Sequence, residues 1–321
     1  MNDLDALART LPVVIHIGYH KTASTWLQRV VFPSQPRLVR VVQESPARLN
    51  PFLAAIVGPH DADFDPSAAR DALDRVAVER LRSEQPGPDG LEPASRVLLV
   101  SAERLSGHAA SGGYDTHRIA DRLAAALEGR DVKVCWLVRE QVSMIESQYR
   151  QLVAHGFCGP IEALWAEEPG WRTVGPRAAY YEYDRLADHY AARFGRERVA
   201  VWAYERLAAD RDGFLTGLAA FCGVGGFGRL SDEAARRVVN PSLPARGLWL
   251  HRALNRLRRT ELNPYAPVDL GPRWRAAAMA LTRRLPPRAA LLPERTRRAL
   301  RERYAPSNAR LAERYGVRFD T

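Results

Sequence analysis

Residues 11–32 of the chain read LPVVIHIGYHKTASTWLQRVVF, and this stretch decides the fold. Its first part, from Leu11 to Ile17, is an apolar run that predicts a strand, and its last part, from Trp26 onward, predicts a helix. A short loop of glycine, lysine, threonine and serine lies between them. Backbone N–H groups at a helix N-terminus point at an anion, and hydroxyl and ammonium groups complete such a cradle. The stretch therefore predicts a phosphate-binding loop.

A lysine in this loop stands out against the composition of the chain. The sequence has 2 lysines and 45 arginines, and one of the lysines is Lys21. A lysine ammonium is a point charge on a flexible stem, so it can follow charge that moves between groups. A coding bias towards arginine also explains the count, so the prediction rests on the whole loop.

The loop differs from a Walker A sequence, which needs G-x-x-x-x-G-K-[ST]. No glycine directly precedes Lys21. A Walker B strand ends in an aspartate that binds Mg²⁺, but the apolar runs at 96–101 and 132–138 lead into Glu103 and Arg139. We therefore expect phosphate binding, and a P-loop kinase is the alternative enzyme.

The pattern K-[ST]-x-[ST]-T-W-L resembles the 5′-phosphosulfate loop of the sulfotransferases that use PAPS (3′-phosphoadenosine 5′-phosphosulfate). This resemblance implies that Lys21 contacts the bridging oxygen and helps the sulfuryl group to leave. It also implies that five residues hold the 5′-phosphate through hydroxyl and backbone N–H groups, namely Thr22, Ala23, Ser24, Thr25 and Trp26. The chain departs from the family at Ala23, where many members have glycine, and at His20, which is often proline in cytosolic members. Alanine is disfavoured if position 23 needs a positive φ.

A second part of the resemblance concerns the 3′-phosphate of the donor. Members of the family bind this phosphate with an arginine at the end of a later strand and a serine eight residues further on. Here Arg139 follows the predicted strand 132–138, and Ser147 lies eight residues later in a predicted helix. A guanidinium is a planar fork that suits a phosphate. The alternative is a surface ion pair and a solvated serine.

A third stretch resembles the scaffold of many sulfotransferases. It runs from YEYDRLADHY at 181–190 through RVAVWAYERL at 198–207 to FCGV at 221–224. The resemblance thus covers about residues 12–224. The later segments NPSL at 240–243 and YAPSNARL at 304–311 resemble bacterial carbohydrate-type members more loosely.

The alternation of strand and helix patterns predicts an α/β fold with a central parallel sheet and helices on both faces. With the resemblance, it implies a P-loop-like three-layer sandwich. We expect a single domain over 1–321, with an α/β core at 12–224 and a helical, arginine-rich C-terminal extension at 240–321 packed on it. The predicted strands lie near 12–18, 38–43, 96–101, 132–138 and 198–203. The predicted helices lie near 25–32, 67–83, 115–129, 141–154, 178–194, 210–221, 246–259, 273–284, 292–303 and 307–315, and the breaker-rich segments 58–66 and 83–90 are predicted loops.

The predicted chemistry is transfer of a sulfuryl group from PAPS to a hydroxyl or amine of a carbohydrate, glycolipid or other small metabolite. In-line attack needs a cation for the leaving phosphate, predicted to be Lys21, and a base for the acceptor proton, predicted to be Glu103. His108 and His20 are alternative bases, because cytosolic aryl-type members use histidine. A structural ion pair with Arg104 is the alternative role of Glu103. Side chains and backbone amides can bind both phosphates of PAPS, so we expect no metal.

The charge of the chain is uneven. Eighteen arginines and six acidic residues lie between Leu243 and Thr321, which gives this part a net charge of +12. Because the whole chain carries +10, the residues before Leu243 carry a net charge near −2. A solvated helix face is the first interpretation, and contact with an anionic surface or nucleic acid is the alternative. No zinc-finger, RNP or helix-turn-helix pattern supports a specific nucleic-acid partner.

The remaining features indicate a globular cytoplasmic protein. The hydrophobic share is 46%, no apolar run approaches the roughly 20 residues of a membrane span, and the acidic N-terminus does not resemble a secretory signal. Cysteines at 135, 158 and 222 have no metal-binding spacing, and Cys135 is predicted to lie in the core. Four apolar residues after the Arg139 helix are predicted to form a small satellite core or, alternatively, an acceptor pocket: Phe157, Leu164, Trp165 and Trp171.

Overall fold

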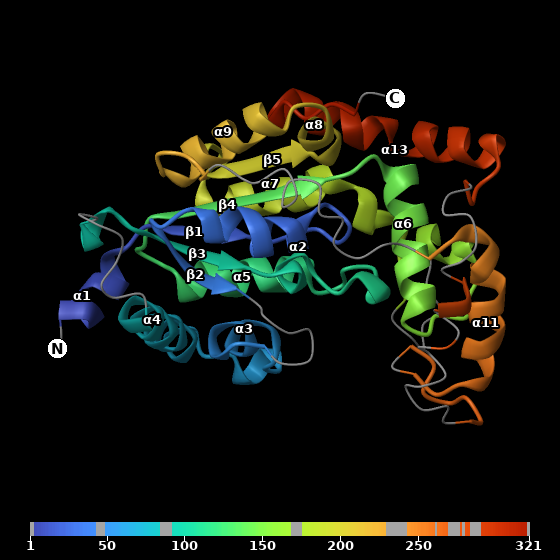
Figure 1. The fold of residues 1–321 in the computed structure, drawn as a ribbon, viewed down its shortest axis with the longest axis horizontal. Helices are drawn as coiled ribbons and strands as arrows, with labels where there is room; N and C mark the ends of the chain where they lie inside the picture. The colour runs from blue at the N-terminus through green and yellow to red at the C-terminus, as the bar shows by residue number, and fades with distance from the viewer. Residues whose placement is uncertain are drawn as a thin grey trace.

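Five parallel strands form one sheet in the computed structural model, which describes residues 3–42, 49–83, 92–167, 175–228, 243–260, 262–268, 277, 280–282 and 290–319 (Figure 1). The strand order is β2-β3-β1-β4-β5. The strands are β1 (Val13–His16), β2 (Leu38–Val42), β3 (Val97–Ser101), β4 (Val132–Val138) and β5 (Val199–Ala203). All five lie within the predicted ranges, and the predicted parallel α/β sheet is confirmed.

The central strands form here because their sequences are continuous runs of branched apolar residues. Every residue of β1 and β3 is buried. Strands of a parallel sheet are covered on both faces, so they lack the alternation of polar and apolar residues that marks a one-sided sheet. Successive side chains still point to opposite faces, and this divides the core in two.

The two faces of the sheet carry separate hydrophobic cores. Val13 and Ile15 of β1 join one core, and Val14 between them joins the other. The first core is covered by α3 (Pro51–Val57), α4 (Pro66–Ser83), α5 (Thr116–Ala126) and α7 (Tyr183–Phe194). The second is covered by α2 (Ser24–Trp26) with the turns that continue it to residue 34, and by α8 (Tyr204–Ala209) and α9 (Arg211–Cys222). The predicted three layers are therefore present.

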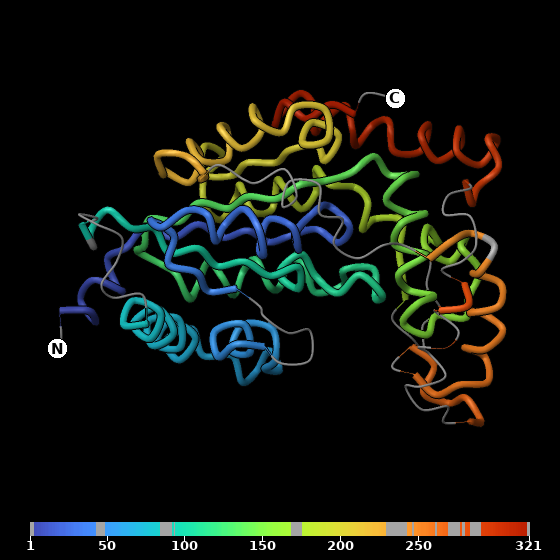
Figure 2. The backbone as a smooth tube through the Cα atoms, viewed as in Figure 1, coloured from blue at the N-terminus to red at the C-terminus, as the bar shows by residue number. Residues whose placement is uncertain are grey.

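Two helices stand beside each other at the edge of the sheet where β4 ends (Figures 1 and 2). They are α6 (Gln141–Ala154) and α11 (Leu248–Leu257). At the opposite edge lies α1 (Asp3–Thr10), which leads into β1. The sequence analysis did not predict α1, α3 or α8, which have 8, 7 and 6 residues, because short helices carry little periodic signal. The predicted helix 273–284 and the predicted loop 83–90 lie largely outside the described residues.

The predicted break between helices 292–303 and 307–315 is wrong. One helix, α13 (Glu294–Tyr315), runs through both ranges with Pro306 inside it. Proline removes one backbone hydrogen bond and usually kinks or ends a helix. Here Tyr304, Ser307 and Leu311 are buried on both sides of the proline, so packing holds the two halves in line.

Polar contacts fix α13 on α6 and α7. Asn308 and the buried Gln141 exchange two amide hydrogen bonds, of 2.6 Å and 3.0 Å. Asp184, 2% exposed, accepts from Ser307 Oγ and from Arg310 Nε, the latter at 2.6 Å. Further arginines of α13 pair with acidic residues of other segments: Arg297 with Glu146, Arg303 with Glu167 and Arg314 with Asp188. No helix in these described ranges is long and apolar enough to cross a membrane.

We expect Asn308→Ala to lower the free energy of unfolding by about 1–3 kcal/mol, because it removes both amide hydrogen bonds and leaves the buried Gln141 with only its bond to the Tyr181 carbonyl. Urea denaturation measures the change. Glu302→Ala, at an exposed position of the same helix, is the matched control and should change stability by less than about 0.5 kcal/mol. Equal effects of the two substitutions would contradict a structural role of the amide pair.

Candidate functional site

The candidate site lies where three neighbouring strands end. His16 of β1 is level with Ser101 of β3 and with Cys135 of β4. Lys21 follows β1, Glu103 follows β3 and Arg139 follows β4 directly. In parallel sheets, ligands bind beyond the carboxyl ends of the strands, where connections leave in opposite directions. The structure places the three predicted side chains at such a point.

β4 extends beyond β1 at this edge, whereas β5 ends level with it. From Cys135, which is level with the last residue of β1, β4 continues three residues to Val138. At about 3.3 Å per residue this is about 10 Å. Arg139 therefore follows a strand end that lies about 10 Å beyond the last paired residue of β1.

The loop after β1 presents unpaired donors. No acceptor within the described ranges bonds the backbone N–H groups of residues 21–25. The Thr22 and Ser24 hydroxyls both donate to the Tyr19 carbonyl, at 2.6 Å and 3.2 Å, and so fold the loop on itself. Successive backbone N–H groups without an acceptor in the described residues are the kind of donor set that binds anions.

Backbone geometry in the loop is unusual. Lys21 and Ala23 have positive φ values of 63° and 65°. For a residue with a Cβ, the left-handed region costs roughly 1–2 kcal/mol. Position 23 thus has the conformation that favours glycine, and alanine there carries strain. A π-helical turn, Leu27–Val31, follows α2 directly, and such turns are frequent at functional sites.

Neighbouring segments of the chain support the loop after β1 through close contacts and hydrogen bonds. A Cβ on Gly18 would lie 3.0 Å from Ser24 Oγ and 3.3 Å from the Cα of Glu103, so the absence of a side chain lets the two segments meet. Ser106 Oγ bonds both the Gly18 carbonyl, at 3.2 Å, and the Glu103 carbonyl, at 2.8 Å. Tyr19 stacks on Tyr180 with ring centroids 4.8 Å apart. Spacing in the sequence gave no signal for these contacts.

Glu103 contacts the loop through a histidine. Its Oε2 lies 3.2 Å from Nδ1 of His20. Burial alone would raise the pKa of the Glu103 carboxyl, but the hydrogen bond from His20 and the nearby charges of His20, Lys21 and His16 hold it below its usual value. Burial lowers the pKa of the Lys21 ammonium, Glu103 opposes that shift, and Arg139 adds to it. The Glu103 carboxylate therefore interacts electrostatically with Lys21, and Lys21 with Arg139.

A buried histidine supports the end of β1. His16 is 1% exposed and its Nδ1 lies 2.8 Å from Ser101 Oγ, to which Gln28 Nε2 also donates at 3.0 Å. Burial lowers the pKa of His16 to about 4, against the opposing effect of Glu103. A neutral imidazole therefore links the last residues of β1 and β3 at neutral pH.

Arg139 is held by the segment that follows β5. Its guanidinium lies 5.1 Å from the ring centre of Tyr204, and its buried Nε has no acceptor in the described part of the chain. Glu205 Oε1 accepts from the backbone N–H of Glu140 at 3.1 Å. Because Val138 pairs with Ala203, the residues that follow the two strands meet. The stretch predicted to be scaffold thus positions a predicted binding residue.

The other predicted site residues have varied surroundings. Ser147 is half-buried in the second turn of α6, and Thr25 is half-buried in the loop. Trp26 is 8% exposed and packs in the core beneath the loop. His108, an alternative base, is exposed, and its ring bonds Ser111. Glu103 does not pair with Arg104, whose guanidinium bonds the buried Asp115 instead.

The residues predicted to form a satellite core join the first core instead. Leu164 is fully buried within it, and Phe157 and Trp165 pack against it, whereas Trp171 lies outside the described residues. Cys135 is buried as predicted. The described ranges contain no group of three or more histidine, cysteine, aspartate or glutamate residues that could hold a metal ion.

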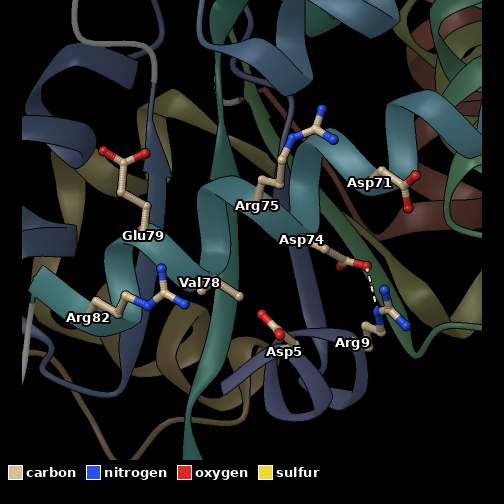
Figure 3. Close-up of a pocket in the computed structure, with 8 residues that line it drawn as sticks. All are labelled: Asp5, Arg9, Asp71, Asp74, Arg75, Val78, Glu79 and Arg82. Carbon is tan, nitrogen blue, oxygen red and sulfur yellow. Dashed lines mark ion pairs between the residues drawn. The ribbon is translucent and has the colours of Figure 1, made fainter. Parts of the chain in front are cut away.

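A separate hollow of about 520 Å³ opens between α1 and α4 (Figure 3). Its lining is of mixed charge: Asp5, Arg9, Asp71, Asp74, Arg75, Val78, Glu79 and Arg82. Arg9 and Arg130 both pair with Asp74, at 3.5 Å and 2.9 Å. Because α1 leads into the amino end of β1, this hollow lies across the sheet from the loop and does not belong to the candidate site.

The sequence matches no family model, and no curated protein matches it. A solved sulfotransferase from Alicyclobacillus acidocaldarius superposes with a TM-score of 0.51 at 17% identity, covering 96% of this chain and 97% of that one. The sulfotransferase domain of the Synechococcus PCC 7002 olefin synthase gives a TM-score of 0.39 at 16% identity, over 92% and 94% of the two chains. A sulfotransferase from Mycobacterium tuberculosis superposes with a TM-score of 0.36 at 15% identity, covering 73% of this chain and 72% of that one. The chain therefore has the fold of a bacterial sulfotransferase, and the first superposition confirms the resemblance predicted from the sequence.

We expect Ala23→Gly to raise the free energy of unfolding by up to about 1 kcal/mol, because glycine adopts the left-handed conformation without the Cβ penalty. Urea denaturation measures the change. Ala299→Gly, in the exposed middle of α13, is the matched control and should lower stability by about 1 kcal/mol. A loss of stability at position 23 equal to that of the control would show that the loop stores no such strain.

Proposed function

We propose that the chain is a sulfotransferase that moves a sulfuryl group from PAPS to a hydroxyl or amine. One observation carries the proposal: two separate groups of anion donors lie at the same edge of the sheet. The first is the loop with Lys21 and the free N–H groups of residues 21–25. The second is Arg139, whose buried Nε lacks an acceptor in the described ranges. A donor with phosphate groups at both ends of one adenosine would engage both.

The residues suit PAPS in charge and in kind. We assign the 5′-phosphosulfate to the loop, where Lys21 and the residues Thr22 to Trp26 would hold it. We assign the 3′-phosphate to Arg139 and Ser147. A buried guanidinium nitrogen without a partner is costly, and a phosphate oxygen would satisfy it. ATP lacks a 3′-phosphate, so this second contact would favour PAPS.

The proposed chemistry uses charges already present at the site. The ammonium of Lys21 would neutralise negative charge that develops on the leaving 5′-phosphate. The acceptor proton would pass to the pair formed by Glu103 and His20, which lies next to the loop. Catalysis of such transfers depends mainly on positioning and on electrostatic stabilisation.

Donor binding tests this assignment with two substitutions. We expect the wild type to bind PAP (3′,5′-ADP), the product of the donor, more tightly than 5′-AMP or ATP with Mg²⁺. Arg139→Ala should weaken PAP binding by about 10- to 100-fold, as for the loss of a hydrogen bond to a charged group, and should barely change 5′-AMP binding. Lys21→Ala should weaken the binding of both. Isothermal titration calorimetry measures the affinities.

Arg256→Ala, on an exposed position of α11, is the control for general loss of positive charge and should leave PAP binding unchanged. Preference for ATP with Mg²⁺ would favour a P-loop kinase. Salt-sensitive binding that survives Lys21→Ala would favour an anion-binding or nucleic-acid-binding protein that uses the arginine-rich C-terminal part.

Because side chains and amides would meet both phosphates, we expect no metal requirement. EDTA should leave turnover of PAPS unchanged, and added Mg²⁺ should not raise it. Strong inhibition by EDTA, reversed by Mg²⁺, would contradict this mechanism.

The proposed acceptor is a carbohydrate, glycolipid or other small metabolite. Incubation with labelled donor and a panel of glycans, lipids and phenols, read by mass, identifies the class. Transfer to phenols alone would contradict a carbohydrate-type acceptor.

A further inference from the structure

His20 and Glu103 form an imidazole–carboxylate pair at the mouth of the site. Nδ1 of His20 lies 3.2 Å from Oε2 of Glu103, and their side chains are 19% and 31% exposed. The two residues come from the segments after β1 and β3, which the strand register brings together. Of the described residues, Glu103 alone bonds His20, so Nε2 of the ring is left without a partner there.

The proton between the two side chains belongs to the histidine. An ionised carboxylate has no hydrogen to donate, so Nδ1 must carry the proton in the hydrogen bond. The pKa of the Glu103 carboxyl lies below its usual value, so the carboxylate is ionised at neutral pH. In a neutral imidazole with hydrogen on Nδ1, Nε2 holds the lone pair. The ring is therefore fixed as a base with its free nitrogen away from Glu103.

We propose that Nε2 of His20 accepts the proton of the acceptor, and that Glu103 is the positioning residue that orients His20. The inference rests on the proposed sulfuryl transfer and revises the sequence prediction that Glu103 itself is the base. The acceptor oxygen forms a bond to sulfur, and the bond from sulfur to the bridging oxygen breaks with its electron pair on the 5′-phosphate. The acceptor proton moves to Nε2, giving an imidazolium that later releases it to water.

Two properties of the pair favour histidine as the base. Glu103 already uses one oxygen in the hydrogen bond, and its depressed pKa makes the carboxylate a weak proton acceptor. General bases work best when they change protonation near the operating pH, and imidazole is the side chain that does so near neutrality. An ionised carboxylate on the other ring nitrogen holds the tautomer and stabilises the imidazolium that forms.

Other charged or titratable groups face this pair from the elements around it. They are Lys21 in the loop, His16 at the end of β1, Tyr180 below the loop and, through Lys21, Arg139 after β4. Lys21 and Arg139 are cationic, and the carboxylate of Glu103 supplies the negative charge next to the ring.

The decisive substitution is His20→Asn. The asparagine amide can replace Nδ1–H as a donor to Glu103 but offers nothing in place of Nε2. We expect kcat/KM to fall by about 100-fold or more, the usual contribution of a general base, with PAP affinity within about threefold of wild type. Activity within a few-fold of wild type would overturn the proposal, because a mere donor to Glu103 would then suffice.

Glu103→Gln gives the complementary result. Glutamine still accepts from Nδ1–H but lacks the charge that stabilises the imidazolium. We expect a smaller loss of kcat/KM than in His20→Asn. A larger loss than in His20→Asn would restore Glu103 as the base.

A spectroscopic measurement keeps the inference testable without an acceptor. Long-range ¹H–¹⁵N correlation spectra of the wild type should show the His20 ring protonated on Nδ1 with a lone pair on Nε2. The opposite tautomer would overturn the inference. Failure of PAP selectivity in the wild type would instead overturn the proposed function.

His189→Asn is the matched control. His189 forms another imidazole–carboxylate pair, with Asp121 at 2.8 Å, between the helices α7 and α5. Its substitution should leave kcat/KM unchanged. An equal loss of activity would show that disturbance of any such pair has a general effect, which would contradict a specific role for His20.

Discussion

Hydrogen bonding of β1 to β3 on one side and to β4 on the other is the constraint on which the site depends. Beyond the last paired residue, Ile17 donates to the Cys135 carbonyl at 3.1 Å and Ala102 donates to the His16 carbonyl at 3.2 Å. These bonds continue the ladders into the loops, so the segments that carry Lys21 and Glu103 leave the sheet side by side. The neutral, buried His16 strengthens this junction through Ser101. A loop with unpaired amides and left-handed residues can persist there because the surrounding backbone is fixed.

Much of this arrangement could be predicted from the sequence, because it follows from local patterns. Apolar runs gave the strands, and the residues just after them gave Lys21, Glu103 and Arg139 as candidates. Contacts between distant segments carried no such signal. The pairing of His20 with Glu103 depends on which strands are neighbours, and the contact of Tyr204 with Arg139 depends on the register of β4 and β5. The continuity of α13 through Pro306 was missed for a related reason, since packing there overrides local preference.

The arginine-rich end of the chain has a structural use that its net charge alone does not reveal. Several arginines of α13 pair with carboxylates of other segments, among them Glu146 on α6 and Asp184 on α7. The more exposed pairs, such as Arg314 with Asp188, each contribute little to stability, but together the pairs favour one orientation of the helix. The first interpretation from the sequence, a solvated helix face, therefore describes only part of this surface. The nearly neutral remainder of the chain supplies the acidic partners.

Because β4 extends beyond β1, Arg139 lies at the end of a rigid stretch of strand. Three residues of extended backbone lie between the level of the last residue of β1 and Arg139, and a strand inside a sheet can neither shorten nor stretch appreciably. Selection among nucleotides would then depend on molecular span: a compound whose anionic groups are too close together or too far apart can occupy only one end. Under the proposed function, the protein would discriminate between nucleotides by the distance between their anionic groups.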